Sequence, residues 1–115
     1  FTILKLSISD LRGITLTTLL EREQIDPSKY QTLIMDMQGS ELLVLQGSVP
    51  ILKNFQYIKT EVPDFESYEG CCQISDIDDF LIRFGYKEIS RNKFASRAEG
   101  GSYFDIVYKK SVGSF

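Results

Sequence analysis

Histidine is absent from this chain of 115 residues, and its absence removes much of the usual chemistry of active sites. Imidazole is the common general base near neutral pH, a frequent metal ligand and a member of most catalytic triads. Any catalysis by this chain must therefore use carboxylates, tyrosines, lysines or a bound cofactor.

Cysteine is scarce, and the two that occur, Cys71 and Cys72, are adjacent. They cannot join distant segments, and without histidine or a second cysteine pair a tetrahedral metal site is incomplete. Thiols used in this way are typical of a reducing compartment, so we expect a cytoplasmic protein.

Long apolar runs and a basic surplus are also missing. No run approaches the roughly 18 apolar residues of a membrane-spanning helix, and no signal-peptide pattern opens the sequence. Thirteen Lys and Arg against sixteen Asp and Glu give a net charge of -3. We therefore expect neither a membrane nor a nucleic acid as a partner.

The composition, with 43% hydrophobic and 25% charged residues, is that of a globular protein, and the length predicts a single domain over residues 1–115. Because the chain begins at Phe1 inside a strand-like pattern, we expect it to be a piece of a longer protein.

Hydrophobic periodicity predicts strands and helices in near alternation. The expected strands are 3–8, 32–37, 57–62, 86–90 and 103–109. The expected helices are 15–24, 39–47, a short turn at 50–54, and one that runs from a capping box at Ser75 and Asp78 to Gly85. Its apolar stripe is Ile77, Phe80, Leu81 and Phe84. Residues 64–73 and 91–102 read as polar loops. The order predicts an α/β fold with a mostly parallel sheet, helices on its faces and a closing antiparallel hairpin.

Asp36 stands at the end of an apolar strand, in "LIMDMQGSELLVLQGS". Its carboxylate can cap the turn from Gln38 to Ser40, or it can face the crevice where α/β sheets bind ligands at the carboxyl ends of their strands. Both interpretations can hold together. Glu61 repeats the pattern in "YIKTEVP", where a solvated strand end is the alternative. Because parallel strands share a carboxyl edge, we expect Asp36 and Glu61 to lie at the same edge of the sheet and to face one crevice. Glu41, in the first turn of a helix, is explained most simply by the helix dipole.

The stretch "DMQGS" also has a superficial likeness to the Asp-x-Asp-x-Thr loop of haloacid dehalogenase-like phosphatases. Gln38 replaces the second aspartate, and Ser40 replaces the threonine. Glutamine cannot act as an acid or base, so half of that mechanism is lost.

Several motifs together resemble the FkbM family of S-adenosylmethionine-dependent methyltransferases. They are "ITLTTLLE", "LIMDMQGSELLVLQGS", "YIKTEV", "FLIRFGY" and "FDIVYK", and they extend over residues 14–110. The matches to the family pattern are Thr15, Leu16, Asp36, Gly39, Glu41, Val44, Leu45, Gly47, Glu61 and Val62. Three departures stand out: Thr17 replaces an aspartate, Met35 ends an otherwise Ile-Lys-Ile-like segment, and Gln38 replaces a glutamate.

The resemblance implies methyl transfer from S-adenosylmethionine to a hydroxyl group of a small molecule or sugar. We predict Asp36 and Glu61 as catalytic residues, and Gln38 and Glu41 as substrate-binding residues. The resemblance also implies a partial Rossmann-like sheet, because the glycine-rich cofactor loop of such enzymes is not found ahead of Asp36. The chain then corresponds to the C-terminal half of the domain, and we expect that it does not bind the cofactor alone.

In the strand order of that fold, the strand at 32–37 would lack its neighbour and expose an apolar edge. The segment 3–8 could cover this edge, or a second copy could pair with it, and we expect the homodimer. A non-catalytic domain that only folds and self-associates is the alternative to an enzyme.

Overall fold

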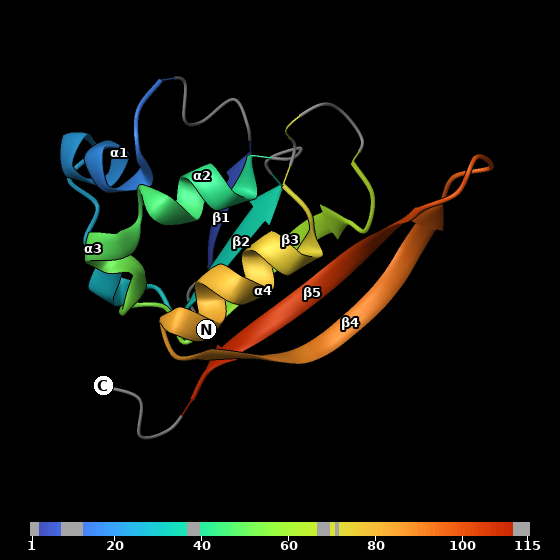
Figure 1. Ribbon diagram of the computed structural model, residues 1–115. Coiled ribbons are helices and arrows are strands. Elements are labelled where there is room, and N and C mark those ends of the chain that lie inside the picture. The colour runs from blue at the N-terminus through green and yellow to red at the C-terminus, as the bar shows by residue number, and fades with distance from the viewer. Residues whose placement is uncertain (1–2, 8–12, 37–39, 67–69, 71, 112–115) are drawn as a thin grey trace.

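A computed structural model of the protein describes residues 3–7, 13–36, 40–66, 70 and 72–111 (Figure 1). The strands are β1 (Ile3–Ser7), β2 (Thr32–Asp36), β3 (Tyr57–Pro63), β4 (Tyr86–Ser96) and β5 (Ser102–Lys110). The helices are α1 (Leu16–Arg22), α2 (Glu41–Gln46), α3 (Val49–Leu52) and α4 (Ile74–Arg83), with a short 3-10 turn η2 (Pro27–Lys29). The order of elements agrees with the sequence analysis.

The described strands form one sheet in the order β1-β2-β3-β5-β4. β1, β2 and β3 pair in parallel, whereas β5 runs antiparallel to β3 on one side and to β4 on the other. The closing antiparallel hairpin is confirmed. The expectation of mostly parallel pairing is corrected, because β5 returns directly from β4 and inserts beside β3. Half of the described pairings are therefore antiparallel.

The described helices lie over one face of the sheet, where α2 and α4 cross in front of the strands (Figure 1). Alternate strand residues on this covered face, such as Leu33, Ile58 and Ile106, have no exposed surface and join a single core with Leu16 and Leu20 of α1. Parallel connections are almost always right-handed, so strands added in one direction keep their helices on one side. The expectation of helices on both faces is corrected accordingly, and we call the other face the helix-free face.

The edge of β2 is covered by the chain itself. β1 pairs with β2 along its whole length, from Ile3 beside Thr32 to Ser7 beside Asp36. This pairing removes the exposed edge on which the expected homodimer was based. Association of two copies stays a prediction, and light scattering at micromolar concentration tests it.

The β4–β5 hairpin is longer than its sequence predicts. Much of the predicted polar loop at 91–102 is strand, because β4 continues to Ser96 and β5 begins at Ser102. Most of β4 faces water on both sides, so its side chains have no apolar alternation that would reveal a strand. Two irregularities in the pairing, between Glu88 and Ser90 and between Lys93 and Ala95, disturb the alternation further.

α4 begins slightly earlier than its capping signal predicts. The backbone N–H of Gln73 donates to the Asp76 carboxylate at 2.9 Å, so the cap uses this pair in place of Ser75 and Asp78. The stripe of Ile77, Phe80 and Leu81 is buried as expected. Phe84, the last member of the stripe, is 38% exposed and does not belong to the core.

Candidate functional site

Two acidic residues from the sequence analysis lie level with each other at the carboxyl ends of neighbouring parallel strands. Met35 of β2 pairs with Thr60 of β3, so the next residues, Asp36 and Glu61, are adjacent as well. Met35 and Thr60 are buried on the covered face, and alternation along the strands turns Asp36 and Glu61 toward the helix-free face. The prediction that these two acids share one edge of the sheet is confirmed, while their catalytic role stays a prediction.

A third carboxylate, Asp105 of β5, extends the pair. It is the register partner of Glu61 across the antiparallel β3–β5 pairing. Its Oδ1 atom is buried and has no hydrogen-bond partner among the described residues. A buried carboxylate oxygen without a partner is costly, and such groups in folded proteins call for an explanation. We call Asp36, Glu61 and Asp105 the acid row.

Glu61 lies in the middle of the acid row, between Asp36 and Asp105. Burial raises the pKa of its carboxyl group, and the nearby charges of Asp36 and Asp105 raise it further, opposed in part by Lys59. A carboxyl group with a raised pKa is a stronger base when ionised, and it can hold a proton closer to neutral pH. Glu61 therefore suits proton transfer or hydrogen bonding to a hydroxyl group.

Sequence reasoning missed Asp105, although a signal was present. In "YFDIVYK" the aspartate interrupts an apolar strand, as Asp36 and Glu61 do in theirs. Its position beside Glu61 depends on the register of β5 against β3, and this register follows from tertiary structure that the sequence does not display.

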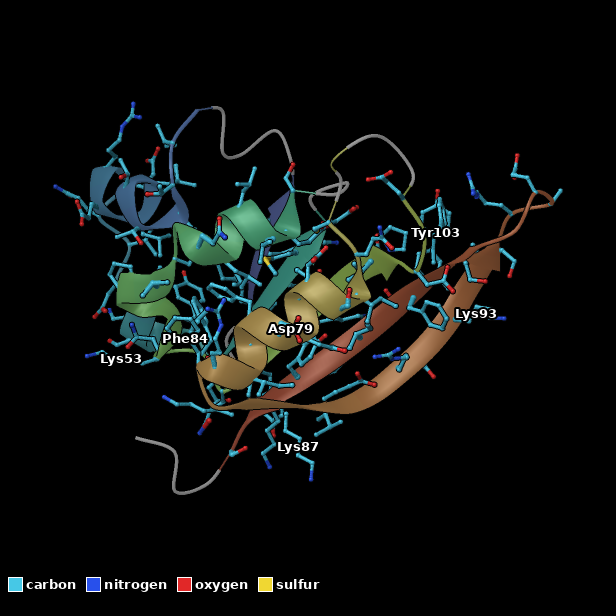
Figure 2. The ribbon with its side chains drawn as sticks, in the orientation of Figure 1. Lys53, Asp79, Phe84, Lys87, Lys93 and Tyr103 are labelled. Carbon is cyan, nitrogen blue, oxygen red and sulfur yellow. The ribbon has the colours of Figure 1, made fainter. Side chains whose placement is uncertain are left out.

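An aromatic cluster flanks the acid row. Tyr103 lies two residues before Asp105 and thus on the same face of β5. The ring of Phe65 packs edge-on against Tyr103 at 5.2 Å, and the Phe94 ring lies 6.1 Å from it. Figure 2 places Tyr103 at the far end of the molecule from Lys53 and Phe84. The acid row thus has an apolar neighbour that could support the body of a ligand.

Glu41 lies at the start of α2, on the covered face of the sheet, whereas the acid row faces the other side (Figure 1). It is fully buried, and the Cys72 thiol donates to its Oε1 atom at 3.5 Å. Burial, together with the Glu41 charge and hydrogen bond, raises the pKa of Cys72 to about 11, so the thiol keeps its proton. The substrate-binding role predicted for Glu41 is untested, and its burial favours a structural role. Gln38 and Cys71 lie outside the described residues.

Residues 8–88 match the family described as the methyltransferase FkbM domain. The chain belongs to the FkbM methyltransferase family. No curated protein and no solved structure gives a significant match. This membership supersedes the phosphatase interpretation of "DMQGS".

Two segments of this FkbM-family chain that carry family motifs pack against each other. The Thr17 hydroxyl donates to the carbonyl oxygen of Gly47 at 2.8 Å. A Cβ atom at Gly47 would lie 2.9 Å from the Cγ2 atom of Thr15, so only glycine allows α1 and α2 to approach so closely. Thr17, which replaces the family's aspartate, has this local structural use.

Two further findings on the described residues concern metal binding and membrane-spanning helices. No group of three or more Cys, Asp or Glu side chains in the described part of the chain is placed to hold a metal ion. None of the described helices is long and apolar enough to cross a membrane.

Proposed function

We propose that this chain is part of an S-adenosylmethionine-dependent methyltransferase that methylates a hydroxyl group of a small molecule or sugar. Two observations support the proposal. The chain belongs to the FkbM methyltransferase family. Two members of its acid row, Asp36 and Glu61, lie toward the carboxyl ends of the parallel strands β2 and β3, where α/β sheets bind their ligands.

In this proposal Glu61 is the general base. The single observation that carries this role is the position of Glu61 between Asp36 and Asp105, near the carboxyl end of β3. Burial and the neighbouring acids raise the pKa of its carboxyl group, which agrees with the role. The ionised Glu61 carboxylate would accept a hydrogen bond from the acceptor hydroxyl and take its proton. Asp36 orients the hydroxyl, and alignment of the reacting atoms accounts for much of the rate. Asp105 acts through Glu61 by keeping its pKa high.

The described residues do not fit a complete cofactor site. Dinucleotide- and nucleoside-binding α/β domains hold their ligand on a glycine-rich turn after the first strand. Between β1 and α1 the described part of the chain has one glycine, Gly13, with a left-handed φ of 73°. A single glycine does not make such a turn, so we derive no step of the reaction through the cofactor.

The helix-free face supports the proposal that the chain is a fragment of a larger domain. Ile34, Tyr57 and Val107 lie on this face and keep part of their surface exposed. Parallel strands, such as β1, β2 and β3 of this sheet, normally have both faces covered. We propose that the remainder of the methyltransferase domain packs on the helix-free face and supplies the missing cofactor contacts.

Calorimetric titration of S-adenosylmethionine into the 115-residue chain tests the fragment proposal. The expected result is no saturable binding, and micromolar affinity would contradict it.

The catalytic proposal is tested separately by methyl transfer from radiolabelled cofactor, using the full-length product of the encoding gene. Glu61→Gln should lower kcat by roughly 10²-fold or more, the usual contribution of a general base. An unchanged kcat would remove Glu61 from the mechanism, and full-length protein without activity toward any acceptor would favour the non-catalytic alternative.

A further inference from the structure

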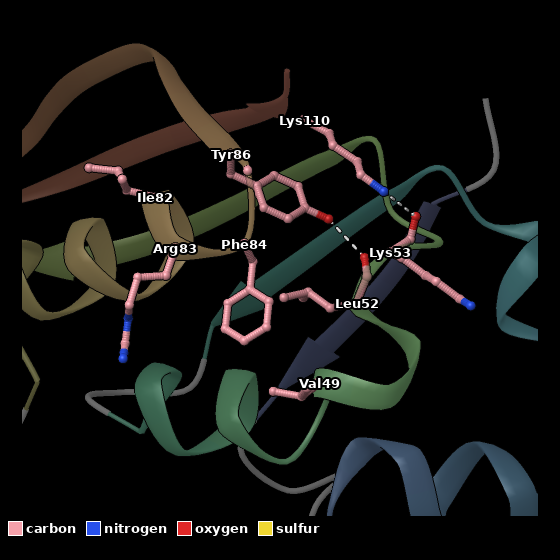
Figure 3. Close-up of a pocket in the computed structure, with 9 residues that line it drawn as sticks. Val49, Leu52, Lys53, Ile82, Arg83, Phe84, Tyr86 and Lys110 are labelled. Carbon is pink, nitrogen blue, oxygen red and sulfur yellow. Dashed lines mark hydrogen bonds between the residues drawn. The ribbon is translucent and has the colours of Figure 1, made fainter. Parts of the chain in front are cut away.

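A cavity of about 460 Å³ lies at the end of the molecule that holds Lys53 and Phe84, far from Tyr103 (Figure 2). It is formed by α3, by the end of α4 and by the adjoining ends of β4 and β5 (Figure 3). Its volume falls within the range of about 300–1,000 Å³ that small-molecule sites have. Neither the family membership nor the acid row accounts for it.

The floor of this cavity is apolar and open to water. Val49, Ile82 and Phe84 line it and are 40%, 64% and 38% exposed, respectively. Leu52 lines it as well and is buried. These side chains place apolar surface in one concave region, as the body of a small ligand requires.

The rest of the lining carries positive charge. Lys53, Arg83 and Lys110 contribute to it, and the described lining residues include no acid. Among the residues that the structure describes, none of the three cations lies within ion-pair distance of a carboxylate. This local surplus contrasts with the net charge of -3 of the whole chain. The carbonyl end of α4 carries a partial negative charge, and Arg83 in the last turn of that helix offsets it.

Of the three cations, Lys110 is the one best placed to bind an anionic group in the cavity. Its ammonium group donates to the backbone carbonyl of Lys53 at 3.1 Å, beside the ring of Tyr86 (Figure 3). An ammonium group has three N–H donors, so this contact leaves donors for a ligand. The hydroxyl group of Tyr86 is already used, because it bonds to the carbonyl oxygens of Leu52 and Phe55 at 2.8 and 2.6 Å. Selectivity must therefore come from the cations.

We propose that this cavity binds a small amphiphilic anion, with one carboxylate or phosphate group on an apolar chain or ring. The anionic group pairs with Lys110, and the apolar body covers Val49, Ile82 and Phe84. Arg83 adds a weaker, longer-range attraction. The site is separate from the acid row and does not depend on the proposed methyl transfer.

The test is an NMR titration of the full chain with decanoate and with decyl phosphate, each below its micelle concentration. Saturable amide shifts are expected at Gly85 and at its neighbours in the cavity wall. Decanol supplies the apolar body without charge, and inorganic phosphate supplies the charge without the body. Both should bind at least about tenfold more weakly than the amphiphilic anions. Stronger binding of decyl phosphate than of decanoate would identify a phosphate group as the preferred head.

Charge-reducing variants locate the anion. Lys110→Gln should weaken decanoate binding about two- to fivefold, the range for loss of one partly exposed ion pair, and Arg83→Gln should weaken it less. Lys93→Gln, an exposed lysine near the other end of the molecule (Figure 2), is the matched control and should change nothing. Equal affinity for decanol and decanoate, or equal losses in the Lys93 and Lys110 variants, would overturn the proposal.

Discussion

The two faces of the sheet are made by alternate residues of the same strands, yet they differ in chemistry. Leu33, Met35 and Ile58 on the covered face have no exposed surface, whereas Asp36 is exposed and Glu61 only half-buried on the helix-free face. The covered face supplies the apolar burial that stabilises the fold. The helix-free face holds acidic groups close to one another, where the charges of Asp36 and Asp105 contribute to the raised pKa of Glu61. Stability and candidate chemistry are thus separated across one layer of backbone.

The largest expected effect comes from truncating isoleucines on the two faces. Ile58→Ala should lower the free energy of unfolding by about 2–5 kcal/mol, because the side chain is fully buried and leaves a cavity. Ile34→Ala, the matched change on the helix-free face, should cost about 1 kcal/mol or less, because that side chain is only half-buried. Urea denaturation measures both. Equal losses would mean that the helix-free face is covered in solution, for example by a second copy of the chain.

A smaller effect is expected at the contact between α1 and α2. Gly47→Ala should destabilise the protein by about 1–3 kcal/mol, because the new methyl group meets the Cγ2 atom of Thr15 at 2.9 Å. Adding Thr15→Ser removes that methyl group but keeps the hydroxyl group that caps α1. The double variant should recover part of the loss in thermal denaturation. No recovery would contradict the steric explanation.

Thr60 offers a stabilising change on the covered face. Its hydroxyl group is buried and has no hydrogen-bond partner among the described residues. Thr60→Val should raise the free energy of unfolding by about 1 kcal/mol, since it removes an unsatisfied polar group at nearly constant volume. Thr32→Val, half-buried on the other face, should be close to neutral. Destabilisation by Thr60→Val would reveal an unseen partner for the hydroxyl.

The smallest expected effect is a change in pH dependence. The pKa of Glu61 is raised in the folded state, so the folded protein binds its proton more tightly than the unfolded chain. Stability from this group is therefore present below the unfolded glutamate pKa and is lost as pH rises through the folded pKa. Glu61→Gln should stabilise the protein relative to wild type more at pH 7 than at pH 4. Denaturation curves at both pH values check the sign, and a larger benefit at pH 4 would reverse it.

The sequence predicted those parts of the molecule whose signals are local. Strong apolar runs marked β2 and β3, and the carboxyl edge that parallel strands share was enough to place Asp36 beside Glu61. The sequence does not predict that Asp105 lies beside Glu61, because this contact depends on the register of β5 against β3. The outer half of β4 is not predicted as a strand, because both of its sides face water and its sequence has no apolar alternation. Helical periodicity places Phe84 on the apolar stripe of α4, but it does not show that the core ends before this residue.

An NMR titration of the Glu61 side-chain carboxyl carbon shows whether the three carboxylates of the acid row interact. The predicted result is a pKa above the ordinary glutamate range in the wild type, because of burial and the charges of Asp36 and Asp105. Asp36→Asn and Asp105→Asn should each bring that pKa down, and Lys59→Met should bring it up, because the lysine opposes the shift. A Glu61 that titrates as an ordinary exposed glutamate, and that does not respond to these three changes, would contradict the account.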